Sequence, residues 1–146
     1  MLFMKKYLLM FLFLTFSLFG YGQTKGEEWR KIRDDETSTI YYNPKITKDK
    51  NGNYIVWVKT IIHSVEWQRY MAQQIGSSSV VTMTKTKAMY DKDYIYAMVR
   101  QVICYNNAGK VLYNSGDDTS AEWELVNASD PVGLVGEYLG EQRYKQ

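Results

Sequence analysis

Few residues of this chain could carry out covalent chemistry. Cys104 is the only cysteine and His63 the only histidine among its 146 residues. A single cysteine cannot form an intramolecular disulfide, and a thiol nucleophile would need His63 beside it as a base. Cys104 lies in the apolar run at residues 102–105, where a small buried residue suits a strand. We therefore predict a buried structural thiol and no enzyme. An intermolecular disulfide and a Cys–His nucleophile are the alternatives.

Metal ligands are equally sparse. One histidine cannot build a zinc centre that needs several. Asp49, Asn51 and Asn53 alternate as at the start of a calcium loop, but the closing Glu and the later ligands are missing. A hairpin turn, favoured by the Asn51-Gly52 pair, is the better interpretation. We predict neither a metal site nor a cofactor.

Aromatic and basic side chains gather instead on three predicted strands. Alternate residues of a strand share a face, so each strand presents such a group on one side. Aromatic residues with basic neighbours are typical of protein-contact surfaces. The alternative is the ordinary solvated face of a half-buried sheet. The candidate protein-binding residues are Trp57 and Lys59 on the first strand, Lys85 and Lys87 on the second, and Tyr94, Tyr96 and Arg100 on the third.

The charge balance argues against nucleic acid as a partner. The chain holds 18 Lys and Arg against 16 Asp and Glu, and two of these lysines, Lys5 and Lys6, belong to the N-terminal leader. Without them the chain carries 16 charges of each sign and is formally neutral. A nucleic-acid binder normally has a strong basic excess. We expect a host extracellular protein or an envelope protein as partner, and the sequence leaves a homodimer open.

Residues 1–22 are typical of a secretory signal peptide. Lys5 and Lys6 form a positive start, residues 7–19 are almost entirely apolar, and Gly20 and Gly22 supply small residues before Gln23. The apolar run is shorter than the roughly 20 residues that span a bilayer. We predict cleavage before Gln23 and export to the periplasm or cell surface, with residues 23–146 forming one domain without a transmembrane segment. An uncleaved anchor is the alternative.

A period of two dominates the remaining chain and predicts an antiparallel sheet. The strongest pattern, at residues 54–62, places Val56 and Val58 on one face and Trp57 and Lys59 on the other. In residues 80–90 we expect Val81, Met83 and Met89 on the side of Lys85 and Lys87. Further strands are expected at residues 28–32, 39–42, 94–105, 111–114 and 121–126. Turn clusters between them favour a meander of about six strands.

Two segments have helical character. Residues 64–75 predict an irregular or helical insertion that ends at Gly76. Near the C-terminus Asp130 can cap a helix with Pro131 at its first position. The apolar stripe of that helix is Val132, Val135, Tyr138 and Leu139. Gly133, Gly136 and Gly140 weaken it, so it must depend on packing. The expected fold class is α+β, an antiparallel sheet of about six strands with a C-terminal helix packed on it.

Several spaced landmarks point to a family. They are the strand at Trp29, the Tyr41-Tyr42 segment, the strand at residues 56–59, the hairpin at residues 105–112, and residues 123–126 followed by a turn and a helix. Together they resemble the surface-adhesin protein E family of exported bacterial domains, over nearly all of residues 23–146. Members commonly carry a Cys pair, but residues 91–93 and 141–144, where it would fall, hold no Cys. The resemblance implies a domain on the cell surface that binds host extracellular proteins.

We therefore predict an exported, non-enzymatic binding or adhesion module that acts through its sheet face. The alternative is a periplasmic module that binds a small apolar ligand or assists envelope assembly. An apolar cavity between sheet and helix would favour the alternative, whereas a filled core with an exposed aromatic and basic face would favour adhesion.

Overall fold

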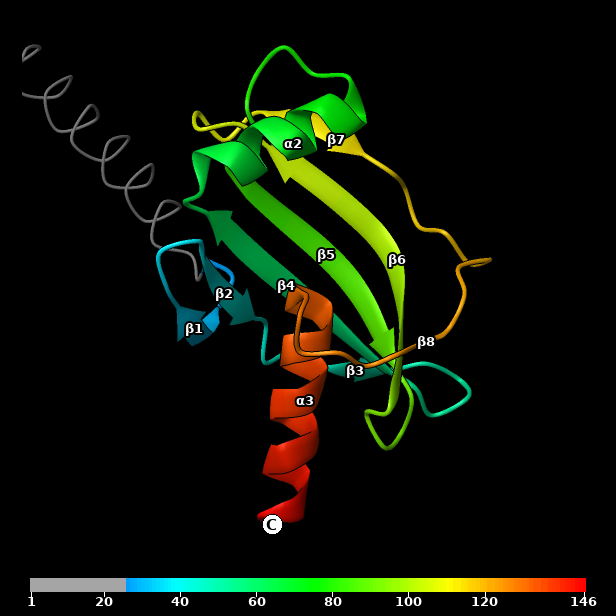
Figure 1. Cartoon of the computed structure of the whole chain (residues 1–146). Helices are drawn as coiled ribbons and strands as arrows, with labels where there is room; N and C mark the ends of the chain where they lie inside the picture. Colours follow the sequence, from blue (N-terminus) through cyan, green and yellow to red (C-terminus); the bar gives the residue numbers. More distant parts are fainter. Residues whose placement is uncertain (1–25) are drawn as a thin grey trace, which may run out of the picture.

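The computed structural model describes residues 26–146, so the predicted signal peptide and its cleavage point lie outside the described residues. The described chain is an antiparallel sheet with two helices, which confirms the predicted α+β class (Figure 1). The strands are β1 (Arg30–Asp34), β2 (Ser38–Tyr42), β3 (Thr47–Lys48), β4 (Tyr54–Ile62), β5 (Met83–Tyr90), β6 (Tyr96–Tyr105), β7 (Val111–Asn114) and β8 (Glu124–Leu125). The helices are α2 (Val65–Ile75) and α3 (Pro131–Tyr144).

The sheet is a meander with two small additions. Its main path runs β1-β2-β4-β5-β6-β7 through antiparallel neighbours, while β3 pairs with β4 and β8 with β6. The six strands of this path confirm the expected meander. The strand expected at residues 121–126 is shorter than predicted, because only Glu124 and Leu125 pair, with Ala97 and Tyr96.

The ambiguous segment after β4 is a helix with a cap at each end. The Ser64 hydroxyl accepts a hydrogen bond from the Trp67 N–H at 3.3 Å and so satisfies one free donor of the first turn. Gly76 ends α2 in the left-handed conformation, at φ 67°, which glycine adopts without strain. The helical alternative for residues 64–75 is therefore correct.

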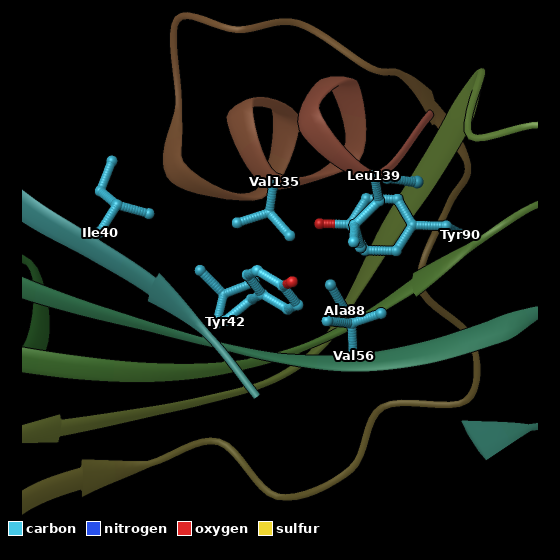
Figure 2. Packing of buried hydrophobic residues seen from close by; sticks show 9 residues of the cluster. Ile40, Tyr42, Val56, Ala88, Tyr90, Val135 and Leu139 are labelled. Carbon is cyan, nitrogen blue, oxygen red and sulfur yellow. The ribbon is translucent and has the colours of Figure 1, made fainter. Parts of the chain in front are cut away.

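Helix α3 begins as its sequence predicts and packs its apolar stripe on the sheet. The Asp130 carboxylate accepts a hydrogen bond from the Gly133 N–H at 2.7 Å, with Pro131 in the first turn. Val135 and Leu139 point from the helix toward the aromatic rings of Tyr42 and Tyr90 (Figure 2). Burial of such side chains contributes about 1.5–3 kcal/mol each, more than the loss that glycines impose on a helix.

The glycines of α3 allow the helix to approach its neighbours closely. A Cβ on Gly136 would lie 2.6 Å from Cε1 of Tyr90, and one on Gly133 would lie 1.6 Å from the Asn127 carbonyl oxygen. At this short separation the Tyr90 hydroxyl donates a hydrogen bond to the Val132 carbonyl at 2.6 Å. Gly133 and Gly136 therefore allow the packing on which the helix depends.

A second apolar cluster lies beneath α2. Ile62, Ala72, Val81 and Cys104 form its buried part, which confirms the predicted buried thiol. The expectation that Val81 shares a side with Lys85 is wrong. Val81 precedes β5 and turns under α2, where its N–H donates to the Gln68 carbonyl at 3.3 Å.

Both helices cover the same face of the sheet. Val56 and Val58 of β4 pack in the cluster of α3, and Ile62, on the same side of that strand, packs under α2. Figure 1 shows α2 across one end of the long strands and α3 near the other. We call this side the covered face. The side that carries Trp57 and Lys59 has no described helix on it, and we call it the open face. Neither α2 nor α3 has the length and apolar character needed to cross a membrane.

Candidate functional site

Strand pairing brings four of the candidate residues together on the open face. In the register of β4 and β5, Trp57 lies opposite Lys87 and Lys59 lies opposite Lys85. Directly opposed side chains on one face of an antiparallel pair have Cβ atoms about 5 Å apart. The two strands therefore present one tryptophan and three lysines as a compact group.

Aromatic rings from three other segments surround two of these lysines. The Lys59 Nζ atom lies 4.4 Å from the ring centroid of Tyr41 and 4.8 Å from that of Trp29. The Lys85 Nζ atom lies 5.5 Å from the ring centroid of Trp29 and 5.6 Å from that of Tyr105. Cations at such distances are attracted to ring faces by about 0.5–1 kcal/mol at exposed sites. We call these five residues the lysine–aromatic cluster.

Carboxylates balance only part of the positive charge. Lys85 pairs with Glu27 at 3.0 Å, and Asp117 receives Lys87 at 3.2 Å and Arg100 at 2.9 Å. Hydrogen bonds from Lys87 and Arg100 hold the pKa of Asp117 below its usual range. Within residues 26–146 no carboxylate lies within 4.0 Å of the Lys59 ammonium. Partial burial, together with the charge of Lys85, lowers the pKa of Lys59.

Arg100 supports the edge of this face more than it presents a free charge. The β5–β6 register shifts between Lys87, opposite Gln101, and Ala88, opposite Val99, so Arg100 is the extra residue of a bulge. Its side chain is 15 % exposed, and Nε and Nη2 donate to the two carboxylate oxygens of Asp117 at 2.9 and 3.0 Å. This bidentate pair fixes the segment after β7 against β6.

The two tyrosine candidates lie outside the lysine–aromatic cluster, and only Tyr94 lies on the covered face. Tyr94 precedes β6 with φ at 57°, and its ring stacks on that of Tyr54 with centroids 5.1 Å apart. It packs in the α3 cluster, so the prediction that it shares a face with Arg100 is wrong. A left-handed residue and a bulge interrupt the alternation on which that prediction depended. Burial raises the pKa of Tyr94 to about 12. Tyr96, 45 % exposed, is the first residue of β6 and lies opposite Leu125. Its neighbour Ala97 packs in the α3 cluster, so Tyr96 points to the open face, as predicted, but lies outside the lysine–aromatic cluster.

Three members of the lysine–aromatic cluster were missed in the sequence. Trp29, Tyr41 and Tyr105 were identified as residues of predicted strands and as landmarks of the resemblance, but not as members of a binding surface. The alternation around each was visible, but its face relative to Lys59 depends on pairing across strands. No single segment of the chain contains that information.

A hollow lies against the cluster, and three cluster residues line it. It measures about 250 Å³ and is lined by Trp29, Trp57, Lys85 and Tyr105 among others. A hollow with aromatic walls and a charged rim can receive one anchoring side chain of a partner, which is how many interfaces gain most of their affinity.

The remaining reactive groups have structural surroundings. His63 is exposed, with Nε2 2.7 Å from the Thr39 hydroxyl, and burial raises the pKa of Cys104. Asp49 accepts the N–H groups of Asn51 and Asn53, each at 2.9 Å, so its carboxylate closes the predicted hairpin turn. In residues 26–146 no three His, Cys, Asp or Glu side chains gather as metal ligands would.

Comparisons of the chain with protein-family models, curated proteins and solved structures found no match in any of the three. The resemblance to the surface-adhesin protein E family therefore stays a prediction.

Proposed function

We propose that the chain is an exported, non-enzymatic binding module that contacts a host extracellular protein or an envelope protein through its open face. The observation that carries the proposal is the lysine–aromatic cluster, in which Lys59 lies between the rings of Trp29 and Tyr41 on a face that no described helix covers.

The composition and rigidity of this face suit protein recognition. Tryptophan and tyrosine are enriched among residues that dominate interface energy. Trp57, Lys59 and Lys85 stand on central strands, paired on both sides, so little freedom would be lost when a partner binds. A partner would meet a largely formed surface.

The charges indicate the chemistry of the partner. Lys59, Lys85, Lys87 and Arg100 meet the carboxylates of Glu27 and Asp117, which leaves an excess of positive charge. An acidic segment with an apolar or aromatic side chain would complement Lys59 and the hollow beside Trp57.

One contact supports the likeness to the adhesin family. The two segments in which that resemblance implies a Cys pair lie together, since the Arg143 guanidinium is 3.5 Å from the Asp93 carboxylate and also contacts the Lys92 carbonyl. An ion pair would here take the place of the disulfide.

Binding can be tested with the secreted chain against a panel of immobilised host matrix proteins. Lys59→Glu should weaken binding about tenfold or more, because it sets a carboxylate against an acidic partner. Lys50→Glu, on the exposed β3–β4 turn at the far end of β4, makes the same charge change away from the cluster and should leave binding within about twofold. Equal losses in both variants would reject the open face as the contact surface.

Location can be tested by protease shaving of intact cells, with a cytosolic and a periplasmic marker as controls. Cleavage while both markers survive would support the adhesin proposal. Protection until the outer membrane is opened would contradict binding to host proteins and leave the envelope protein as partner.

A further inference from the structure

A pocket lies on the covered face between the two helices. It measures about 420 Å³, within the range of small-molecule sites. Helix α2 covers one end of this face and α3 the other, so no helix lies over the strands between them. These strands form the floor of the pocket. Trp67 and Met71 of α2 form one wall, and Val126 and Val132 near the start of α3 form another.

The floor carries three threonines where an apolar core would use valine. Thr60 lies directly opposite Thr84, and Thr86 follows on the same side of β5. Thr60 and Thr84 are only 2 % and 8 % exposed. None of the three hydroxyls forms a side-chain hydrogen bond with another described residue. Within residues 26–146, however, every fully buried side-chain polar atom has a hydrogen-bond partner. The three hydroxyls are therefore not fully buried, and they face solvent in the pocket that they line.

The rim of the pocket is acidic. Glu122, Glu124 and Asp130 lie among its lining residues, and none of the described lining residues is basic. The N–H of Gly133, in the first turn of α3, is already taken by the Asp130 carboxylate. An anion would meet three carboxylates and no countercharge, so the rim disfavours anionic ligands.

We propose that this pocket binds a small neutral or cationic amphipathic molecule, with its apolar ring body between α2 and α3 and a polar group directed at the threonine hydroxyls. Because these hydroxyls face the pocket, a polar ligand group can replace water as their hydrogen-bond partner, and this contact fixes the orientation of the ligand. This site lies on the opposite side of the sheet from the lysine–aromatic cluster and does not depend on the proposed protein-binding function.

Two matched fluorescent probes test the site. N-phenyl-1-naphthylamine is neutral, with an apolar ring body and one N–H group, and 8-anilino-1-naphthalenesulfonate adds an anionic sulfonate to the same rings. We expect the neutral probe to bind saturably and the anion to bind about tenfold more weakly or worse, because the rim repels it. Equal binding of both probes would overturn the proposed charge selectivity.

Matched variants locate the probe. Thr86→Phe fills the floor and should weaken the neutral probe about tenfold or more, whereas Gln101→Phe, on the open face, should change it by about twofold at most. Thr60→Val with Thr84→Val keeps the volume, removes two hydroxyls and should weaken the probe about threefold to tenfold. If Thr86→Phe fails to fold, this isosteric double variant tests whether the probe binds in the pocket. Unchanged affinity in it would overturn the role of the hydroxyls, and Lys59→Glu should leave probe binding unchanged.

Discussion

The two faces of the sheet are built from alternate residues of the same strands, but different elements pack on them. On β4 the covered face presents Val56, Val58 and Ile62, which two helices seal. The open face presents Trp57 and Lys59, whose partners are other strand residues and the segment before β1. One face therefore holds the fold together, whereas the other keeps large aromatic and charged groups within reach of a partner.

Contacts on the open face contribute little to the stability of the protein. Side chains of the open face lie over strands that the opposite face already fixes, so their own contacts add modestly to the free energy of folding. Substitutions should therefore divide by face: on the covered face they should affect folding, and on the open face they should affect binding.

Neighbouring isoleucines give the largest expected contrast. Ile62→Ala removes a side chain that is 2 % exposed under α2 and should lower the free energy of unfolding by about 3 kcal/mol. Ile61→Ala makes the same change on the partly exposed open face and should cost about 1 kcal/mol. Urea unfolding of both variants measures the difference. Equal losses would remove the distinction between the faces.

Two glycines of α3 test how closely the helix packs on its neighbours. Gly133→Ala should cost about 3 kcal/mol, because its Cβ would strike the Asn127 carbonyl, which belongs to the backbone. Gly140→Ala in the same helix meets its nearest neighbour, the Cβ of Tyr94, at 3.4 Å. That variant should be neutral or gain up to about 1 kcal/mol from helix propensity. Thermal unfolding compares them, and a stable Gly133→Ala protein would contradict the close approach.

Alkaline pH should act on the covered face through its buried tyrosines. Burial raises the pKa of Tyr94 to about 12 and that of Tyr90 well above 10. The unfolded chain then loses protons first, so stability is intact below pH 10 and falls as the pH rises toward 12. Tyr94→Phe should retain about 1 kcal/mol that the native protein loses there, because solvent at the half-buried ring screens part of the effect.

Unfolding in urea at pH 9 and pH 11 would measure this change. Tyr144→Phe, at a position 84 % exposed near the C-terminus, serves as the control and should follow the native protein. An identical loss of stability for Tyr94→Phe and the native protein between these pH values would contradict the role of Tyr94.

Removal of the central charge of the open face should have the smallest effect on stability. Lys59→Met keeps an apolar stem between Trp29 and Tyr41 but loses the cation–π attraction, and it also removes the cost of partly burying an ammonium. The two effects oppose each other, so the free energy of unfolding should change by about 0.5 kcal/mol or less. A loss as large as that of Ile62→Ala would make Lys59 a structural residue.

Local patterns in the sequence predicted much of the fold. The alternation at residues 54–62 and the Asp130-Pro131 start of α3 each depend on neighbours in the chain, and both predictions are confirmed. The glycines of α3 were interpreted as weak points, because their benefit comes from Tyr90 and Asn127, which are distant in sequence or lie outside the helix.

The candidate sites depended on information that no single segment contains. Trp57, Lys59, Lys85 and Lys87 were predicted strand by strand, but their common face follows from the β4–β5 register. Tyr94 was placed on the wrong face because it adopts the left-handed conformation just before β6, which breaks the alternation of the strand. A cavity between sheet and helix entered the prediction only as the mark of the alternative function. Its threonine floor was not predicted, because the three threonines become neighbours only after β4 and β5 pair.

The central claim is that the open face, and not the covered one, meets the protein partner. The most direct test measures the affinity of the native chain, of Trp57→Ala with Lys59→Ala, and of Thr84→Val for the same immobilised matrix or envelope protein. We expect the open-face double variant to bind about tenfold more weakly or worse, and Thr84→Val to bind within about twofold of the native protein. Retained binding by the double variant, or a comparable loss in Thr84→Val, would contradict the claim.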